Sequence, residues 1–145
     1  MMEKAHVLHC FDAPPAKVFS AWLDPAEIGR WMFGPEVRDE TIVSLENDPV
    51  VGGRFRFVVD RDGQRLEHVG VYLEIVPGKR LVFTWSIGDQ PPSTVKLVIA
   101  PFGDGCQLDL VHDLGPAWSP YIDKVRASWS AMLDALAHHL ADKVS

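Results

Sequence analysis

The residue with the clearest chemical potential is His112, because Leu108, Leu110 and His112 occupy every second position of one segment. Alternate residues of a β-strand share a face, so the two leucines place His112 on a face that points into the protein. An imidazole in that position could contact a ligand or act as a general base. A core histidine bonded to a backbone carbonyl is the structural alternative. We expect a polar group that lines a binding cavity.

Large apolar side chains are the other candidates for binding. Trp85 shares an expected strand face with Leu81 and Phe83, whereas Trp31 and Trp129 fall on expected helices. Such rings could stack on a flat apolar ligand or simply fill the core, and the sequence leaves both readings open. The flexible side chain of Met132 could likewise contact a ligand or fill a gap in the core. The predicted ligand-binding residues are Trp31, Phe57, Trp85, His112, Trp129 and Met132.

Motifs for metal binding or covalent catalysis do not occur in the sequence. His138 and His139 would point about 100° apart on a helix, and His6 and His9 lie on opposite faces of an expected strand. There is no HExxH, CxxC or GxSxG motif, and Gly103-Asp104-Gly105 is typical of a hairpin turn. We therefore expect no metal and no cofactor, and we assign no catalytic residue.

Composition limits the classes of partner. The 145 residues suit one domain, residues 1–145, and 47% hydrophobic with 23% charged residues indicates a folded protein. A net charge of −6 disfavours nucleic acid and anionic membrane surfaces. No stretch approaches the roughly 20 apolar residues of a membrane span, so we expect no membrane insertion.

Two further features predict a cytoplasmic protein. The N-terminal residues 1–6 lack the continuous apolar region of a signal peptide. Cys10 and Cys106 are the only cysteines, which is too few for a disulfide framework, so we expect two reduced thiols.

The elements that must position these residues follow from periodicity and turn signals. A strand is expected at 5–11, a short helix from Pro15, and a second short helix opened by Asp24 as N-cap and Pro25 as first helical residue. Short turns, among them the hairpin signal Asp62-Gly63, then separate six expected strands. These strands span residues 37–46, 54–59, 66–76, 81–85, 94–100 and 106–112.

Alternation within two of these strands predicts which side chains face the core. Phe55 and Phe57 alternate with Arg54 and Arg56, so the arginines should face solvent. In the segment 66–76, we expect Val71, Leu73 and Ile75 in the core and Tyr72 and Glu74 outside.

The last segment predicts a long amphipathic helix. Ser119 suits the N-cap and Pro120 the first helical position. One apolar stripe recurs at steps of three and four residues. It consists of Ile122, Val125, Trp129, Met132, Leu133, Leu136 and Leu140.

The order of strand, two short helices, six strands and long helix predicts an α+β protein. Successive strands without intervening helices form an antiparallel meander, and the apolar stripe of the long helix must lie on that sheet. A curved antiparallel sheet of six to seven strands would then wrap the C-terminal helix and leave a pocket between them. The two short helices would gate one end of this pocket.

A set of short motifs is spread in order over nearly the whole chain. They are Ala13-Pro14, Val18-Phe19, Ala21-Trp22, Asp24-Pro25, Trp31, Gly52-Gly53-Arg54-Phe55, Gly70, Glu74-Ile75, Pro77, Leu81-Val82-Phe83-Thr84-Trp85, Leu108-x-Leu110-x-His112, Trp129, Leu133 and Leu136. With these motifs the sequence resembles the SRPBCC (START-like, birch-allergen-like) superfamily and, within it, the family of proteins similar to the activator of the heat-shock-protein ATPase. The resemblance implies a helix-grip fold, with functions that vary widely among members.

Three functions are compatible with these observations. The first is a domain that binds a hydrophobic small molecule, a lipid or an aromatic metabolite, in the cavity between sheet and helix. The second is a polyketide-cyclase-like or hydratase-like enzyme in the same cavity, which would need a polar partner for His112. The third is a stress-response or co-chaperone-like protein-interaction module. A homodimer is an open alternative to a monomer.

Overall fold

The structure is a computed structural model that describes residues 4–114 and 120–144, with side chains described up to residue 141. The chain forms seven strands and three helices in this part. They are β1 (Lys4–Phe11), α1 (Pro15–Ala21), α2 (Pro25–Trp31), β2 (Thr41–Asn47), β3 (Arg54–Arg61), β4 (Gln64–Val76), β5 (Arg80–Ile87), β6 (Ser93–Phe102), β7 (Gly105–Asp113) and α3 (Ile122–Val144).

The strands form one antiparallel sheet in the order β1-β7-β6-β5-β4-β3-β2. Strands β2 to β7 follow one another as a meander, and β1 pairs with β7. The two edge strands are therefore β1 and β2, which α1 and α2 connect. Asp62 and Gly63 have φ angles of 53° and 79°, the two positive values of a tight hairpin turn, as the sequence predicts.

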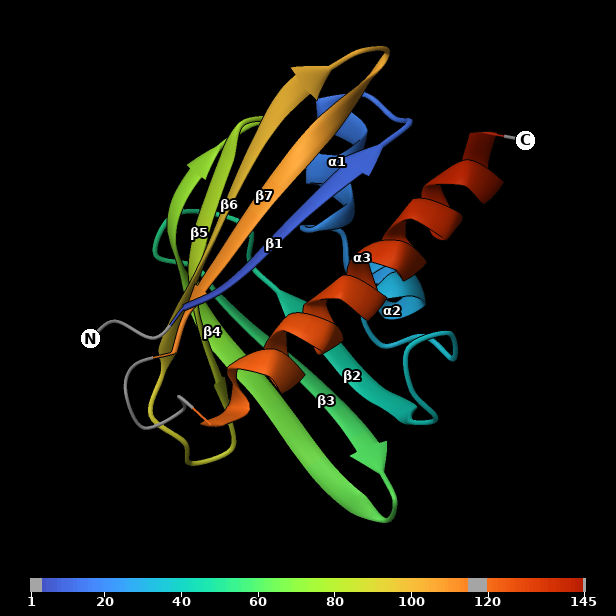
Figure 1. The fold of residues 1–145 in the computed structure, drawn as a ribbon. Coiled ribbons are helices and arrows are strands. Elements are labelled where there is room, and N and C mark those ends of the chain that lie inside the picture. Colours follow the sequence, from blue (N-terminus) through green and yellow to red (C-terminus); the bar gives the residue numbers. More distant parts are fainter. Residues whose placement is uncertain (1–3, 115–119, 145) are drawn as a thin grey trace.

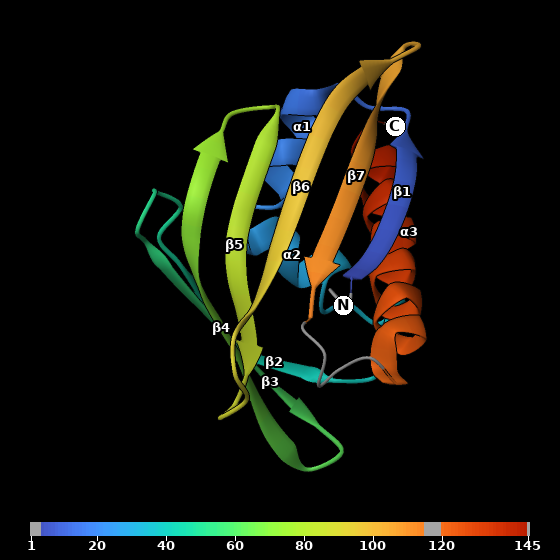
Figure 2. The same cartoon turned by 60° about the vertical axis from the view of Figure 1, so that its left-hand side comes forward.

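All three helices lie on the same side of the curved sheet (Figure 1), and Figure 2 shows α1 and α2 behind the sheet from its other side. Helix α3 crosses this face, contacts β1 and α2, and buries the expected apolar stripe, including Trp129, Leu133 and Leu136. Burial of that stripe against sheet and short helices supplies the main stabilising force for α3. The arrangement is the helix-grip architecture predicted from the sequence.

The short helices begin where their capping residues predict. The Asp24 side chain accepts a hydrogen bond from the Ala26 N–H at 3.0 Å, and Pro25 occupies the first helical position of α2. At the other end of the chain, Pro120 precedes α3, which begins at Ile122. The predicted N-cap Ser119 lies outside the described residues.

The strand predicted to begin at Val37 begins at Thr41 instead. The Val37 and Arg38 N–H groups both donate to the Gly34 carbonyl, at 3.1 and 3.3 Å, so the chain turns after α2 before it extends. Local turn bonds replace ladder bonds here, since only one of residues 37–40 is apolar. The prediction was wrong by four residues, and those residues form a loop on the helical side of the sheet.

The face assignment predicted for 66–76 is also wrong in part. Tyr72 is buried at 3% exposure, whereas Leu73 is 49% exposed. The cause is a β-bulge: Tyr72 pairs with Phe83 and Glu74 with Val82, so Leu73 is an extra residue that reverses the alternation. Ile75 packs against the core as expected, on the far side of the bulge. Arg54 and Arg56 are exposed, as the sequence predicts.

Gly70, beside this bulge, lies where the neighbouring strand and an aromatic ring approach the backbone closely. A Cβ atom at Gly70 would lie 2.0 Å from the Thr84 carbonyl oxygen and 2.4 Å from the Phe55 ring. Gly70→Ala is therefore expected to lower the free energy of unfolding by about 3 kcal/mol, since backbone and ring must both move. Thermal unfolding should show this as a decrease in Tm of roughly 10 °C.

Gly29→Ala in α2 is the matched control. Its new Cβ would meet only the Cδ1 atoms of Leu45 and Ile42, at 3.0 and 3.3 Å, and both belong to flexible side chains. Alanine also favours the helix by up to about 1 kcal/mol, so the Tm should change by a few degrees at most. An equal Tm for Gly70→Ala and the wild type would contradict the close approach at Gly70.

Aromatic rings fill the space under the short helices. Trp22 packs edge-on against Trp31, with ring centroids 4.7 Å apart, and stacks on Trp129 at 5.8 Å. Trp31 is fully buried, and its indole N–H donates to the Ala21 carbonyl at 2.9 Å. The hollow left beside these rings measures about 10 Å³, barely one water molecule. This end of the interior is a filled core.

Candidate functional site

A larger hollow, the inner pocket, lies between the N-terminal half of α3 and the sheet. Its volume is about 140 Å³. Strands β3, β4, β5 and β7, helix α3 and the segment between α2 and β2 contribute to its walls. It is lined by Phe33, Arg38, Arg61, His68, Trp85, Ile87, His112, Val125, Ser128, Trp129 and Met132.

A second hollow of about 90 Å³ adjoins the inner pocket, because Trp85, Ile87, His112 and Val125 line both. It extends to Pro91 in the loop between β5 and β6. A dry protein cavity of about 150 Å³ can accept one benzene ring. The inner pocket therefore has room for one ring or a short branched chain, with further space toward the β5–β6 loop.

Four of the six residues predicted to bind a ligand meet at the inner pocket: Trp85, His112, Trp129 and Met132. The other two do not line it. Trp31 lies in the filled core beneath the short helices, and Phe57 lies beside Phe33 with ring centroids 5.7 Å apart. Neither α1 nor α2 contributes a lining residue, so the predicted gate by these helices is not seen.

His112 belongs to a chain of hydrogen bonds that joins α3 to the sheet. The Trp129 indole N–H donates to Nδ1 of His112 at 3.0 Å, and Nε2 of His112 lies 2.6 Å from the Ser93 hydroxyl oxygen. The Ser93 hydroxyl lies 2.9 Å from the Trp85 carbonyl oxygen and donates to it. Because an indole N–H can only donate, Nδ1 must be the acceptor nitrogen and Nε2 must carry the proton.

This tautomer decides what the Ser93–His112 pair can do. A histidine that activates a serine must accept the hydroxyl proton on an unprotonated nitrogen. Here Nε2 is protonated and donates to Ser93, so His112 does not activate the hydroxyl. Burial lowers the pKa of His112 to about 4, against a smaller opposing effect of Asp113, so the ring is neutral near pH 7. In this arrangement His112 orients Trp129 on the pocket wall.

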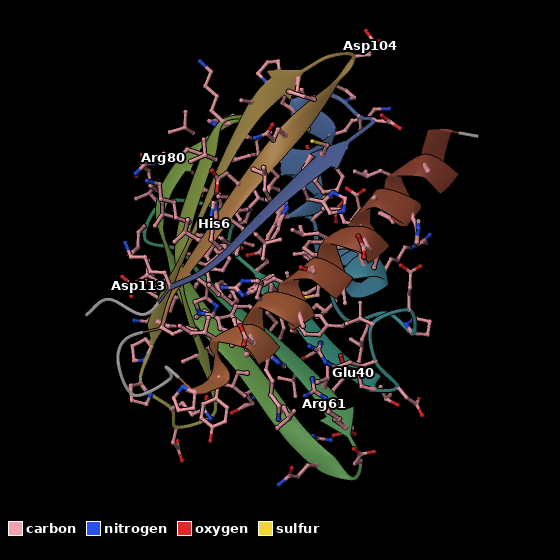
Figure 3. All side chains as sticks on the ribbon, in the orientation of Figure 1. His6, Glu40, Arg61, Arg80, Asp104 and Asp113 are labelled. Carbon is pink, nitrogen blue, oxygen red and sulfur yellow. The ribbon has the colours of Figure 1, made fainter. Side chains whose placement is uncertain are left out.

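Part of the lining of the inner pocket, called the polar wall here, is strongly polar. Arg38 comes from the segment after α2, Arg61 from the end of β3 and Ser128 from α3. Nη2 of Arg38 donates to the Ser128 hydroxyl. Nε of Arg61 donates to Oε2 of Glu40 at 2.9 Å, and Nη2 of Arg61 forms an ion pair with the same oxygen at 2.9 Å. Figure 3 shows these two side chains side by side.

His68 completes this polar wall. Its Nδ1–H donates to the Phe57 carbonyl at 3.1 Å, which leaves Nε2 as an acceptor with no further hydrogen bond in the described part of the chain. The pKa of His68 is lowered to about 4, chiefly by burial and to a smaller extent by the charges of Arg61 and Arg38. The ring is therefore neutral near pH 7.

Sequence reasoning missed Arg38, Glu40, Arg61 and His68 as site residues. For two of them, Arg61 and His68, the sequence contains a pattern that could have placed them on the inner face of the sheet. The alternation of Phe55, Phe57 and Val59 continues to Arg61 on the inner face, and the two-residue turn at 62–63 pairs His68 with Phe57. Arg38 and Glu40 gave no such signal, because they lie in a loop without periodicity.

A hollow with a greater volume than the inner pocket lies outside the sheet. This outer groove measures about 550 Å³ and is lined by exposed Arg54 and Arg56 together with Val69, Val71 and Thr84 of the bent strands. It is an open surface over a single layer of sheet, so a ligand there would keep much of its contact with water. The inner pocket is the stronger candidate for a binding site, because its walls would enclose a ligand on several sides.

No group of three His, Cys, Asp or Glu side chains is placed to hold a metal ion in residues 4–114 and 120–144. No described helix is long and apolar enough to span a bilayer.

A curved antiparallel sheet that grips a long C-terminal helix, with a pocket between them, is the helix-grip fold, and the family match that follows places the chain in the START-like (SRPBCC) superfamily. Residues 12–141 match the family described as Activator of Hsp90 ATPase homolog 1-like protein. The chain belongs to this family, as its sequence resemblance predicts. No curated protein matches the sequence significantly.

Solved structures share the fold over nearly the full chain. Protein CV1439 from Chromobacterium violaceum is 27% identical, with a TM-score of 0.82 over 94% of this chain and 95% of that one. CalU16 from Micromonospora echinospora is 26% identical, with a TM-score of 0.73 over 99% and 79% of the two chains. A protein from Rhodobacter sphaeroides, 20% identical with a TM-score of 0.85 over 97% and 93%, shows the fold alone.

Proposed function

We propose that the chain is a binding domain for a small hydrophobic molecule, of the size of an aromatic metabolite or a short lipid fragment, held in the inner pocket. The observation that carries this proposal is the contrast within one interior. The core under α1 and α2 is filled, whereas the space under the first half of α3 stays open. Two rigid indoles, Trp85 and Trp129, form part of its wall and would give a flat ligand large contact area at little entropic cost.

A cytoplasmic location is part of this proposal. Cys10 is exposed, Cys106 is buried, and both are free thiols, as expected in a reducing compartment. Whether the protein is a monomer or a homodimer is a separate question, which light scattering would answer by measuring the molar mass in solution.

A cyclase-like or hydratase-like enzyme in the same pocket is the second candidate. Its support is the unengaged Nε2 of His68, which could accept a hydrogen bond from a substrate on the pocket wall. In this candidate function His68, and not His112, would be the general base. If the protein turns over a ligand found by binding, His68→Gln should reduce kcat by about 100-fold or more.

A thermal-shift screen with hydrophobic acids, aromatic polyketides and lipids tests the proposal. A ligand present at a hundredfold its Kd should add ~2.7 kcal/mol and raise the Tm by roughly 5–10 °C. Met132→Trp places a larger side chain at the pocket wall and should abolish this shift. Ala131→Trp adds the same ring on the exposed side of α3 and should leave the shift intact.

Two outcomes would contradict binding in the inner pocket. One is the absence of any stabilising ligand across the panel. The other is a ligand that stabilises Met132→Trp as much as the wild type.

A further inference from the structure

The polar wall of the inner pocket brings together two arginines from different parts of the chain. Arg38 and Arg61 both line the pocket, and the charge of Arg61 contributes, after burial, to lowering the pKa of Arg38, against a smaller opposing effect of Glu40. Both arginine charges also lower the pKa of His68. The two guanidinium groups are therefore close enough to repel each other across the pocket.

Positive charge is in excess on this wall. Glu40, whose side chain is 0% exposed, balances Arg61 through its Oε2 atom. Arg38 has only the neutral Ser128 hydroxyl as a hydrogen-bond partner in the described residues, and residues 115–119 carry no charged side chain. His68 and His112 are neutral near pH 7. Two guanidinium groups and one carboxylate thus leave one uncompensated positive charge beside a partly buried pocket.

Unused donors accompany this charge. Arg38 contacts Ser128 through Nη2, so its Nε and Nη1 groups have no recorded hydrogen bond in the described residues. Arg61 contacts Glu40 through Nε and Nη2, so its Nη1 group likewise remains able to donate to a ligand. Planar guanidinium groups bind planar anions such as carboxylates through paired N–H donors. A single bound carboxylate would both neutralise the excess charge and occupy these donors.

We propose that Arg38 and Arg61 form an anion subsite in the inner pocket, and that its ligand is a small aromatic or branched aliphatic carboxylic acid. This inference rests on the proposed function, because the apolar part of the acid would fill the pocket against Trp85, Val125 and Met132. The volume of about 140 Å³ fits one ring. A doubly charged phosphate fits less well, since Glu40 has already neutralised one of the two arginines.

The test compares three probes that share one apolar body: 3-phenylpropanoate, 3-phenylpropan-1-ol and 3-phenylpropylamine. Isothermal titration at pH 7 should show the acid binding about 10- to 100-fold more tightly than the alcohol, and the amine more weakly than both. Arg38→Met should remove the preference for the acid, and Arg38→Lys should keep part of it. Arg54→Met, which removes an exposed arginine of the outer groove, should change nothing.

The outcomes separate the subsite from the pocket. Equal affinities of acid and alcohol for the wild type, both lost in Met132→Trp, would overturn the anion subsite and leave the hydrophobic pocket standing. No binding of any probe at 10 mM would overturn both. A preference for the acid that survives in folded Arg38→Met would also overturn the subsite. If Arg38→Met fails to fold, the ratio of the acid and alcohol affinities of the wild type, together with the same ratio for Arg38→Lys, decides the question.

Discussion

Replacing Trp129 with alanine is expected to lower the free energy of unfolding by about 3–5 kcal/mol. Trp129 is 2% exposed and joins α3 to the rest of the interior: its ring stacks on Trp22 and lies 5.6 Å from Trp85. Its N–H also satisfies Nδ1 of His112. Alanine would remove the ring contacts and leave a buried acceptor without its donor. Urea denaturation followed by circular dichroism measures this loss.

Trp129→Phe separates packing from hydrogen bonding. Phenylalanine keeps most of the ring contact but cannot donate to His112, so the expected loss is smaller, about 1–3 kcal/mol. A double-mutant cycle of Trp129→Phe with His112→Phe should give a coupling energy of about 1 kcal/mol or more. Additive single-mutant effects would contradict the hydrogen-bond chain, and a Trp129→Ala protein as stable as the wild type would contradict the packing.

The second large effect is a loss of stability as the pH falls from about 6.5 toward 4. Burial is the chief cause that lowers the pKa of His68 and of His112 from 6.5 to about 4 in the folded protein. Between these values the unfolded chain binds protons that the folded protein does not bind, so acid favours unfolding. Between pH 7.5 and 5, each histidine should reduce the free energy of unfolding by about 2 kcal/mol.

Above pH 7 both histidines are neutral in both states, and their contribution to the pH dependence disappears. His68→Gln keeps a donor for the Phe57 carbonyl and should remove about half of the slope between pH 5 and 6.5. His6→Gln, at a side chain 59% exposed, serves as the surface control. Stability that is independent of pH in this range, or a slope unchanged by His68→Gln, would contradict the neutral buried histidines.

The architecture could be predicted because its signals are local and repeated. Asp24-Pro25 marks the start of α2, Asp62-Gly63 fixes one hairpin, and the stripe from Ile122 to Leu140 identifies the helix that the sheet grips. The two errors in the sheet have different causes: turn hydrogen bonds to the Gly34 carbonyl delay the start of β2, and one extra residue breaks the alternation of β4. The extra residue Leu73 reversed the faces of β4, since a bulge leaves no mark in the pattern of apolar residues.

The candidate site was predictable only on its apolar side. Trp85, His112, Trp129 and Met132 follow from strand parity and helical spacing, and all four line the inner pocket. The polar wall depends on long-range geometry. Arg38 reaches Ser128, 90 residues further along the chain, through a loop whose course no periodicity describes. The tautomer of His112 likewise depends on a partner from another element, Trp129.

Locating a bound probe would show whether a small hydrophobic molecule binds between α3 and the sheet. We would label the methyl groups of methionine, isoleucine and valine with carbon-13, add 3-phenylpropanoate, and record intermolecular nuclear Overhauser effects. We expect contacts from the phenyl protons to Met132, Ile87 and Val125 of the inner pocket. Contacts to Val69 and Val71 of the outer groove instead would contradict it.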